Sequence, residues 1–260
     1  MLLRPALREG FEVLLLRRAS ASAFAPNAYV FPGGAVDEWD APEHMRGHLL
    51  GSEDEKIDHM YRARSSDLLP SPCDPPTRDE ARSLLAAAAR ELFEEAGVLI
   101  VRTHDGALQH LGPTEARVAR IRDEVRSNRR TFASALEELG LVIDGNEFAL
   151  FSHWVTPVGE ARRFNAFFFA ARTLRGQDAA SDDSETHNAR WMTPRAALDA
   201  YAQRRLNLVF PTIKHLERLA AFDDLDAFMV HAMHKPIITI APDRTPAEGF
   251  TLPEELENVW

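Results

Sequence analysis

Cysteine is nearly absent from the chain. Cys73 is the only cysteine among 260 residues, which excludes an internal disulfide. It lies among prolines and an aspartate, with no group nearby in sequence that would stabilise a thiolate, so we expect a structural cysteine. A chain without disulfides suits a reducing compartment, and we expect this protein to be cytoplasmic.

Positive charge is also scarce. Lys and Arg total 30 against 40 for Asp and Glu, which gives a formal net charge of −10 at pH 7. Nucleic acids and anionic membrane surfaces bind clustered Lys and Arg, so we expect neither as a partner. An anionic small molecule is compatible with this charge, because bound divalent cations invert the local potential.

Long hydrophobic runs are missing as well. No run approaches the roughly 20 apolar residues of a membrane span. The N-terminus lacks the apolar segment of a signal peptide, and the last residues are not a peroxisomal Ser-Lys-Leu tail. A hydrophobic content of 45% is ordinary for a globular protein. We therefore expect a single domain over residues 1–260, without a membrane partner.

The most informative stretch is residues 77–98, which has the pattern of a helix with both ends marked. Thr77 and Glu80 have the spacing of a capping box. The alanines at 86–89 favour helix strongly. Gly97 stands where a helix ends in a left-handed residue.

Three acidic residues gather near the end of this helix. Glu91, Glu94 and Glu95 stand at i, i+3 and i+4, which places them on one face. They repel one another and meet the negative end of the helix dipole. Clustered carboxylates are the ligands that Mg²⁺ or Mn²⁺ prefers. The alternative is a solvated acidic face, partly neutralised by an ion pair between Arg90 and Glu94.

The segment 90–98 resembles the second half of the Nudix box, G-x5-E-x7-R-E-U-x-E-E-x-G-U with U aliphatic. Upstream, Phe31-Pro32-Gly33-Gly34 resembles the opening of that box. Residues 36–76 split the two halves as an insertion, a feature similar to a Nudix subgroup that includes a peroxisomal coenzyme A diphosphatase of animals. Arg82 stands in the register of the first box acid, and Asp79 and Glu80 are the nearest candidates to replace it.

The resemblance implies an α/β (α+β) fold, a Nudix-type α/β/α sandwich with a mixed sheet and a further helical insertion at about 106–145. Alternating and apolar patterns predict the strands of this sheet, and capping signals and periodicity predict its helices. The strands are expected at 11–17, 29–31, 98–101, 147–155, 163–171 and 237–240, and the helices at 114–126, 131–139, 194–201 and 211–221.

The resemblance also implies the roles of the site residues. Glu94 and Glu95 would be the principal ligands of Mg²⁺ or Mn²⁺, with Glu91 as a ligand or base and Arg90 orienting a carboxylate. Glu185, in an acidic loop, is either a further ligand or general base or an ordinary solvated residue.

On the substrate side, Gly33 and Gly34 would allow close backbone approach beside Phe31. Arg17 or Arg18 would clamp the phosphates, and only one of the two faces the site because neighbouring strand residues point to opposite faces. The alternative for these arginines is an edge charge that prevents aggregation.

The function implied is divalent-metal-dependent hydrolysis of a nucleoside diphosphate derivative, most simply coenzyme A or an acyl-CoA. Hydrolysis of ADP-ribose or a dinucleotide is the enzymatic alternative. A non-catalytic Nudix-fold nucleotide sensor is the third, because the first box acid is missing. The apolar strands around 147–171 are compatible with a homodimer.

Overall fold

The computed structural model describes residues 1–7, 10–22, 25–62, 75–109, 111–157, 159–160, 163–174, 178–180, 186–245, 249–256 and 260. Within these ranges, no helix has both the length and the apolar character needed to cross a membrane.

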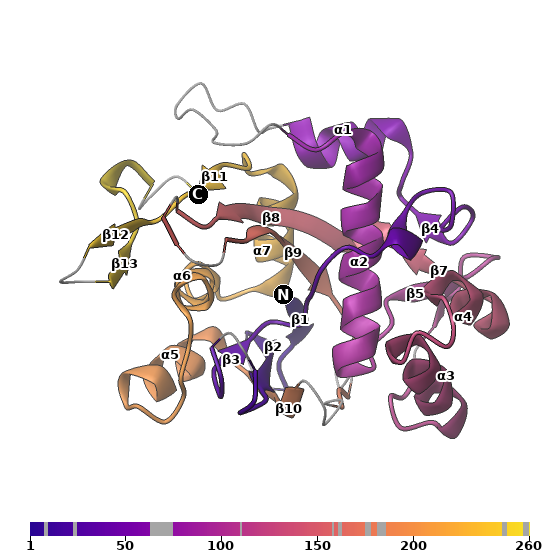
Figure 1. Ribbon diagram of the computed structural model, residues 1–260, viewed down its shortest axis with the longest axis horizontal. Helices are drawn as coiled ribbons and strands as arrows, with labels where there is room; N and C mark the ends of the chain where they lie inside the picture. Colours follow the sequence, from indigo (N-terminus) through magenta and orange to yellow (C-terminus); the bar gives the residue numbers. More distant parts are fainter. Residues whose placement is uncertain are drawn as a thin grey trace.

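A seven-stranded mixed sheet forms the centre of the molecule (Figure 1). Its strands follow the order β10-β2-β1-β9-β8-β11, and β3 pairs with β2. The β1–β9 and β8–β11 pairs are parallel, and the other pairs are antiparallel. The bounds are β1 (Leu2–Pro5), β2 (Phe11–Arg18), β3 (Tyr29–Val30), β8 (Phe148–Val155), β9 (Asn165–Arg172), β10 (Thr186–Met192) and β11 (Thr239–Ile240).

Both faces of this sheet are covered by helices. Leu14 and Leu16 of β2 belong to the core cluster that contains α2 (Arg78–Ala96). Their neighbours Val13 and Leu15 belong to the core cluster on the other face, with α5 (Pro194–Ala202), α6 (Phe210–Leu219) and α7 (Leu225–His234). This alternation is the period of a β-strand buried on both sides. The predicted α/β/α sandwich with a mixed sheet is confirmed.

The two insertions meet in a second, four-stranded sheet of order β4-β7-β5-β6. The first insertion contributes β4, which pairs in parallel with β7. Its described elements are the 3-10 helix η1 (Glu38–Asp40), β4 (Leu49–Leu50) and α1 (Asp54–Arg62). The second region contains β5 (Val101–Thr103), β6 (Leu108–Gln109), α3 (Ala116–Arg126), α4 (Phe132–Leu139), β7 (Leu141–Asp144) and the 3-10 helix η2 (Gly145–Glu147).

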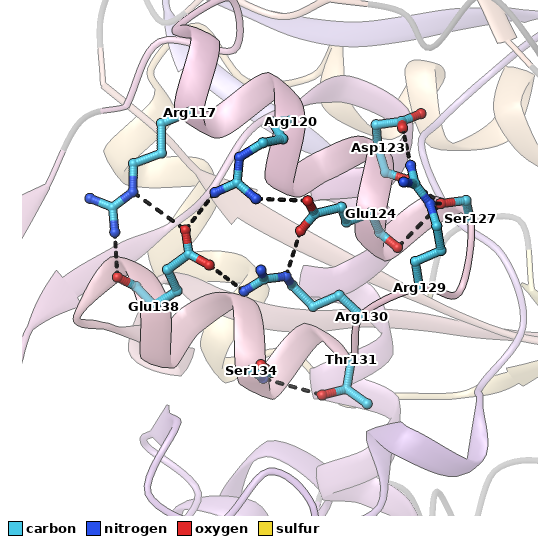
Figure 2. A network of polar contacts seen from close by, with 10 residues as sticks. All are labelled: Arg117, Arg120, Asp123, Glu124, Ser127, Arg129, Arg130, Thr131, Ser134 and Glu138. Atoms are coloured by element: carbon cyan, nitrogen blue, oxygen red, sulfur yellow. Dashed lines mark hydrogen bonds and ion pairs between the residues drawn. The ribbon is translucent and has the colours of Figure 1, made fainter.

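Helices α3 and α4 are joined by a ring of charged side chains (Figure 2). Arg120 donates to Glu124 at 2.7 Å and to Glu138 at 2.6 Å. Arg130 pairs with the same two carboxylates at 2.7 and 2.5 Å. Glu138 also contacts Arg117 at 3.7 Å, so each of the two carboxylates faces at least two guanidinium groups.

The ends of α2 agree with the capping signals in the sequence. The Thr77 hydroxyl accepts from the backbone N–H of Glu80, whose carboxylate accepts in return from the N–H of Thr77. Gly97 closes the helix at φ +67°. The helices predicted at 114–126, 131–139, 194–201 and 211–221 are also present, with ends shifted by at most a few residues.

One expected strand was wrong, and some elements were not expected. The apolar run 98–101 was expected to be a strand, but pairing begins only at Val101. Val98, Leu99 and Ile100 are buried without belonging to a sheet. An apolar run signals burial, and it does not distinguish a strand from a buried connection. Helix α7 was not expected, and neither was the small hairpin of β12 (Asp243–Thr245) and β13 (Gly249–Thr251), which is followed by the 3-10 helix η3 (Glu254–Leu256).

Candidate active site

Arg90, near the end of α2, is the centre of the candidate site. Its side chain is largely buried, with 11% of its surface exposed. Its guanidinium donates to both oxygens of Asp40, each at 2.9 Å. It also donates to the Ala35 carbonyl at 2.8 Å, and through Nη1 to Oε1 of Glu91 and Oε1 of Glu94, both at 2.9 Å. The two glutamate oxygens are thus close neighbours around one nitrogen.

The last turn of α2 carries more negative than positive charge. The guanidinium of Arg90 contacts the carboxylates of Asp40, Glu91 and Glu94, and Glu95 follows on the same turn. Asp40 and Glu95 are buried, with 1% and 8% of their surface exposed. Burial raises the pKa of Glu91 from 4.5 to about 7; Arg90 opposes this shift and the Glu94 charge adds to it. One guanidinium therefore does not satisfy the local demand for positive charge. We name these four carboxylates with Arg90 the carboxylate turn.

The glycine segment after β3 crosses α2 at this turn (Figure 1). The backbone N–H of Gly33 donates to Oε2 of Glu95 at 2.9 Å. A β-carbon at Gly34 would clash with the Glu91 carboxyl group, so a larger residue there would displace this carboxyl group. The two halves of the split box, distant in sequence, are thus in direct contact.

The donors of the carboxylate turn fit a hard divalent cation. Glu91, Glu94 and Glu95 offer carboxylate oxygens on one turn, with an excess of negative charge, and the side chains of Glu91 and Glu94 remain 14% and 17% exposed. In the present side-chain arrangement, no three acidic, His or Cys groups of the described residues form a metal cluster. Glu185, expected as a further ligand or base, lies outside the described residues.

The missing first box acid is not replaced from the start of α2. Arg82, which stands in its register, donates to the Ser52 carbonyl at 2.9 Å and pairs with Asp54 of α1. Asp79 pairs with Arg82 at 3.0 Å, and Glu80 caps the helix. Glu80 lies about 16 Å along the axis from Glu91, at 1.5 Å per residue. This end of α2 fixes the insertion and takes no part in the carboxylate turn.

The expected substrate-binding residues lie in three different environments. Arg17 donates to the side-chain oxygen of Asn27 at 2.8 Å and lines a cleft beside β3. Arg18 donates to the Ser22 hydroxyl at 3.0 Å. The ring of Phe31 is 7% exposed and packs edge-on against Phe168, so the structure places it in the core and not on an open surface.

Asp40 was missed as a site residue. It lies in the insertion, and the sequence offers only the local signal of a cap: Asp37 and Asp40 form a capping box around η1. Oδ2 of Asp40 accepts from the Asp37 N–H at 2.8 Å as well as from Arg90. The contact with Arg90 joins residues far apart in sequence and is not visible from local spacing.

Comparison with known proteins agrees with this geometry. A family model described as the NUDT19 Nudix domain matches residues 3–219. The acyl-coenzyme A diphosphatase NUDT19 of Xenopus laevis is 31% identical, over 85% of this chain and 63% of that protein. The human protein of the same name is 30% identical, over 85% of this chain and 64% of that protein.

Two further relatives extend the comparison. The putative nudix hydrolase 7 of Caenorhabditis elegans is 27% identical, over 92% of this chain and 65% of that protein. The chain therefore spans just under two thirds of the length of the curated relatives it matches. The crystal structure of a NUDIX hydrolase from Alicyclobacillus acidocaldarius shares the fold, with a TM-score of 0.67 at 24% identity over 88% of this chain and 92% of that chain.

Proposed function

Since this chain belongs to the Nudix family, in the group described by the NUDT19 Nudix domain, we propose that it is a divalent-metal-dependent hydrolase of nucleoside diphosphate derivatives. Coenzyme A or an acyl-CoA is the proposed substrate. Three of the relatives are named acyl-coenzyme A diphosphatases, at 28–31% identity.

The observation that carries the proposal is the charge imbalance of the carboxylate turn. Arg90 contacts three carboxylates, those of Asp40, Glu91 and Glu94, and the pKa of Glu91 rises to about 7. A sequence selected only for stability has no reason to keep this arrangement, because a buried negative excess destabilises the fold. A cation and a phosphate-bearing substrate supply the reason.

Each residue of the turn has a distinct proposed role. Glu91, Glu94 and Glu95 would hold Mg²⁺ or Mn²⁺, which when bound neutralises the diphosphate and lowers the pKa of the attacking water. Arg90 holds the carboxylates of Glu91 and Glu94 in place by charge-assisted hydrogen bonds, and Asp40 holds Arg90 in the same way.

If Glu91 is not a ligand, it is instead the proposed general base, which would accept the proton of the attacking water. Gly33 and Gly34 leave room for the substrate to approach the backbone above this turn. The cleavage would release a phosphopantetheine and adenosine 3′,5′-bisphosphate.

The presence of Arg82 at the position of the first box acid favours a second candidate function. In this alternative the chain is a Nudix-fold sensor that binds a nucleotide without hydrolysing it. The usual acid of the box is absent at this position. The ion pair of Arg82 with Asp54 gives the substitution a structural purpose, and the carboxylate turn is complete without it. Hydrolysis therefore remains the better supported function.

The test is hydrolysis of a substrate panel with Mg²⁺ and with Mn²⁺: CoA, acetyl-CoA, ADP-ribose, NADH and diadenosine polyphosphates. We expect preferential turnover of the CoA compounds. Glu94→Gln should lower kcat by at least about 10³-fold, because it removes a charge from the metal site. The matched control is Glu137→Gln, which changes an exposed glutamate of α4.

Three outcomes are informative. Turnover of ADP-ribose or dinucleotides in place of CoA would assign the enzymatic alternative. Binding of a panel member without hydrolysis would assign the sensor. Wild-type rates in Glu94→Gln would contradict the role of the carboxylate turn.

A further inference from the structure

A cleft of about 530 Å³ lies beside β3, between the end of β2 and the chain that links α5 to α6. Its volume is in the range of small-molecule sites. The lining combines cationic, aromatic and amide side chains: Arg17, Asn27, Tyr29, Arg190, Tyr201, Arg204, Arg205, Leu206 and Asn207. We name it the arginine cleft.

The four arginines of the cleft lack acidic partners within the described part of the chain. Arg17 donates to the Asn27 amide oxygen at 2.8 Å, and Arg205 to the Gln203 amide oxygen at 2.9 Å. The Arg190 guanidinium lies 5.3 Å from the centre of the Tyr29 ring. The amide oxygens and the Tyr29 ring orient these three guanidinium groups without neutralising their charge. The cleft is therefore strongly positive in a chain of net charge −10.

The shape of the cleft is fixed by backbone contacts. The N–H of Tyr29 donates to the Asn207 carbonyl at 2.8 Å, and Tyr29 forms a parallel bridge with Leu208. Asn27 and Arg204 both have a left-handed backbone, with φ of +61° and +56°. Such conformations persist only where the surrounding structure imposes them, and they concentrate at ligand sites. Tyr29, one of the residues that line the cleft, is buried and forms the bottom of the cleft.

The arginine cleft is close to the carboxylate turn. Tyr29 precedes Gly33, whose N–H touches Glu95. At about 3.3 Å per residue, the chain between Tyr29 and Gly33 spans at most about 13 Å. This upper limit on the separation of the two backbone positions is compatible with one nucleotide that contacts both places.

We propose that the arginine cleft binds a phosphate monoester on the nucleoside half of the substrate, while the diphosphate of the same molecule lies at the carboxylate turn. This inference rests on the proposed function. Planar guanidinium groups match phosphate oxygens in pairs of hydrogen bonds. The ring of Tyr201, 39% exposed at the rim, offers a surface for stacking. The cleft thus selects nucleotides with a third phosphate.

The first experiment compares CoA with 3′-dephospho-CoA, which has the same diphosphate and lacks the monoester. We expect the wild type to prefer CoA through a lower KM. The double variant Arg190→Gln/Arg204→Gln should raise the KM for CoA at least about tenfold, with little change in kcat. The constants for 3′-dephospho-CoA should change much less. Both side chains are exposed, so the variant is expected to fold.

The control is Arg120→Gln, which removes an arginine already paired with Glu124 and Glu138 (Figure 2). It should leave the constants for both substrates unchanged. Equal losses for both substrates in the double variant, or no change in either, would overturn the proposal.

A binding measurement separates this inference from the proposed function. Calorimetry without metal should show tighter binding of adenosine 3′,5′-bisphosphate than of adenosine 5′-monophosphate, and the double variant should lose the difference. If the wild type binds both equally, the inference fails even where hydrolysis occurs. If the difference is present but no panel substrate is hydrolysed, the proposed function fails and the cleft assignment stands.

Discussion

The ring of charged side chains between α3 and α4 and the carboxylate turn of α2 are both built from arginine and acidic residues. They differ in how many guanidinium groups each carboxylate contacts. In the ring, Arg120 and Arg130 each pair with both Glu124 and Glu138, and Glu138 also contacts Arg117, so each carboxylate has at least two cationic partners (Figure 2). In the turn, the single guanidinium of Arg90 contacts three carboxylates, those of Asp40, Glu91 and Glu94. The ring is a structural clamp at the surface, whereas the turn retains a negative excess at the edge of the core.

The pKa values in the two regions move in opposite directions. Hydrogen bonds from Arg120, and then from Arg130, lower the pKa of Glu124. Burial raises the pKa of Glu91 to about 7, although Arg90 opposes the shift. A carboxylate paired at the surface prefers its charge, and a buried carboxylate in negative surroundings resists it. The sign of the shift thus distinguishes a structural ion pair from a site that requires a cation.

The largest expected effect is that of Arg90→Gln. It removes the guanidinium that contacts the carboxylates of Asp40, Glu91 and Glu94. We expect hydrolysis to fall to background and the free energy of unfolding to fall on the order of 3 kcal/mol. Activity assays and urea unfolding measure the two effects.

A matched control for Arg90→Gln lies on the same helix. Arg78→Gln changes an arginine with exposed partners, Asp54 and Asp58, and should alter activity little. Added Mg²⁺ should recover part of the stability lost in Arg90→Gln. Stability equal to that of the wild type without metal would show that the turn is not strained by its negative excess.

Asp40→Asn is expected to have the next largest effect. The substitution keeps the shape of the side chain but replaces a buried carboxylate that receives two hydrogen bonds from Arg90. Supporting residues of this kind typically contribute 10- to 100-fold, so we expect kcat to fall by about that factor. Asp58→Asn in α1 of the same insertion is the control. Equal kcat values in the two variants would mean that Arg90 is held without Asp40.

Glu91 should make the stability of the metal-free protein depend on pH. Its pKa is raised in the folded state, so the native protein binds the proton more tightly than the unfolded chain. The associated stability is complete below pH 4.5 and is lost as the pH rises to about 7. The loss is on the order of 3 kcal/mol.

Urea unfolding of the metal-free protein at several pH values tests the predicted loss of stability between pH 4.5 and 7. Glu91→Gln should flatten the curve between pH 4.5 and 7 relative to the wild type. A wild-type curve that is already flat in this window would contradict the raised pKa of Glu91.

The smallest expected effect on stability and activity is that of a substitution in the ring of charged side chains between α3 and α4. Glu124→Gln removes a surface ion pair with Arg120 and Arg130, and such pairs contribute little in water. The melting temperature should fall by no more than about 2–4 °C, and activity should not change. A larger loss would mean that the ring holds the helical insertion in place.

Much of the fold follows from local signals. The ends of α2 are specified by Thr77, Glu80 and Gly97, because capping depends on residues within one turn. The strands β8 and β9 were expected from two apolar segments of the sequence, and they pair with each other in the structure. The run 98–101 shows the limit, because apolar character alone does not say whether a buried segment pairs with a strand.

The candidate site likewise has one part that the sequence predicts and another part that it does not. Glu91, Glu94 and Glu95 share a face because of the helical period, so their proximity is readable from spacing. The role of Asp40 and the composition of the arginine cleft cannot be predicted from the sequence, because they depend on contacts between distant segments. Arg17, Arg190 and Arg204 come from three separate parts of the chain, and only the pairing of β2 with β10 and the bridge from Tyr29 to Leu208 bring them together.

The sequence by itself determined the elements, the split box and the acidic turn of α2, because backbone hydrogen bonding and side-chain periodicity act over a few residues. Only the tertiary structure decided which charges meet. It placed Asp40 against Arg90, used Arg82 to fix the insertion, and left four arginines around one cleft without acidic partners among the described residues. The physical reason is that electrostatic pairing depends on distance and burial in space, and a linear sequence records neither.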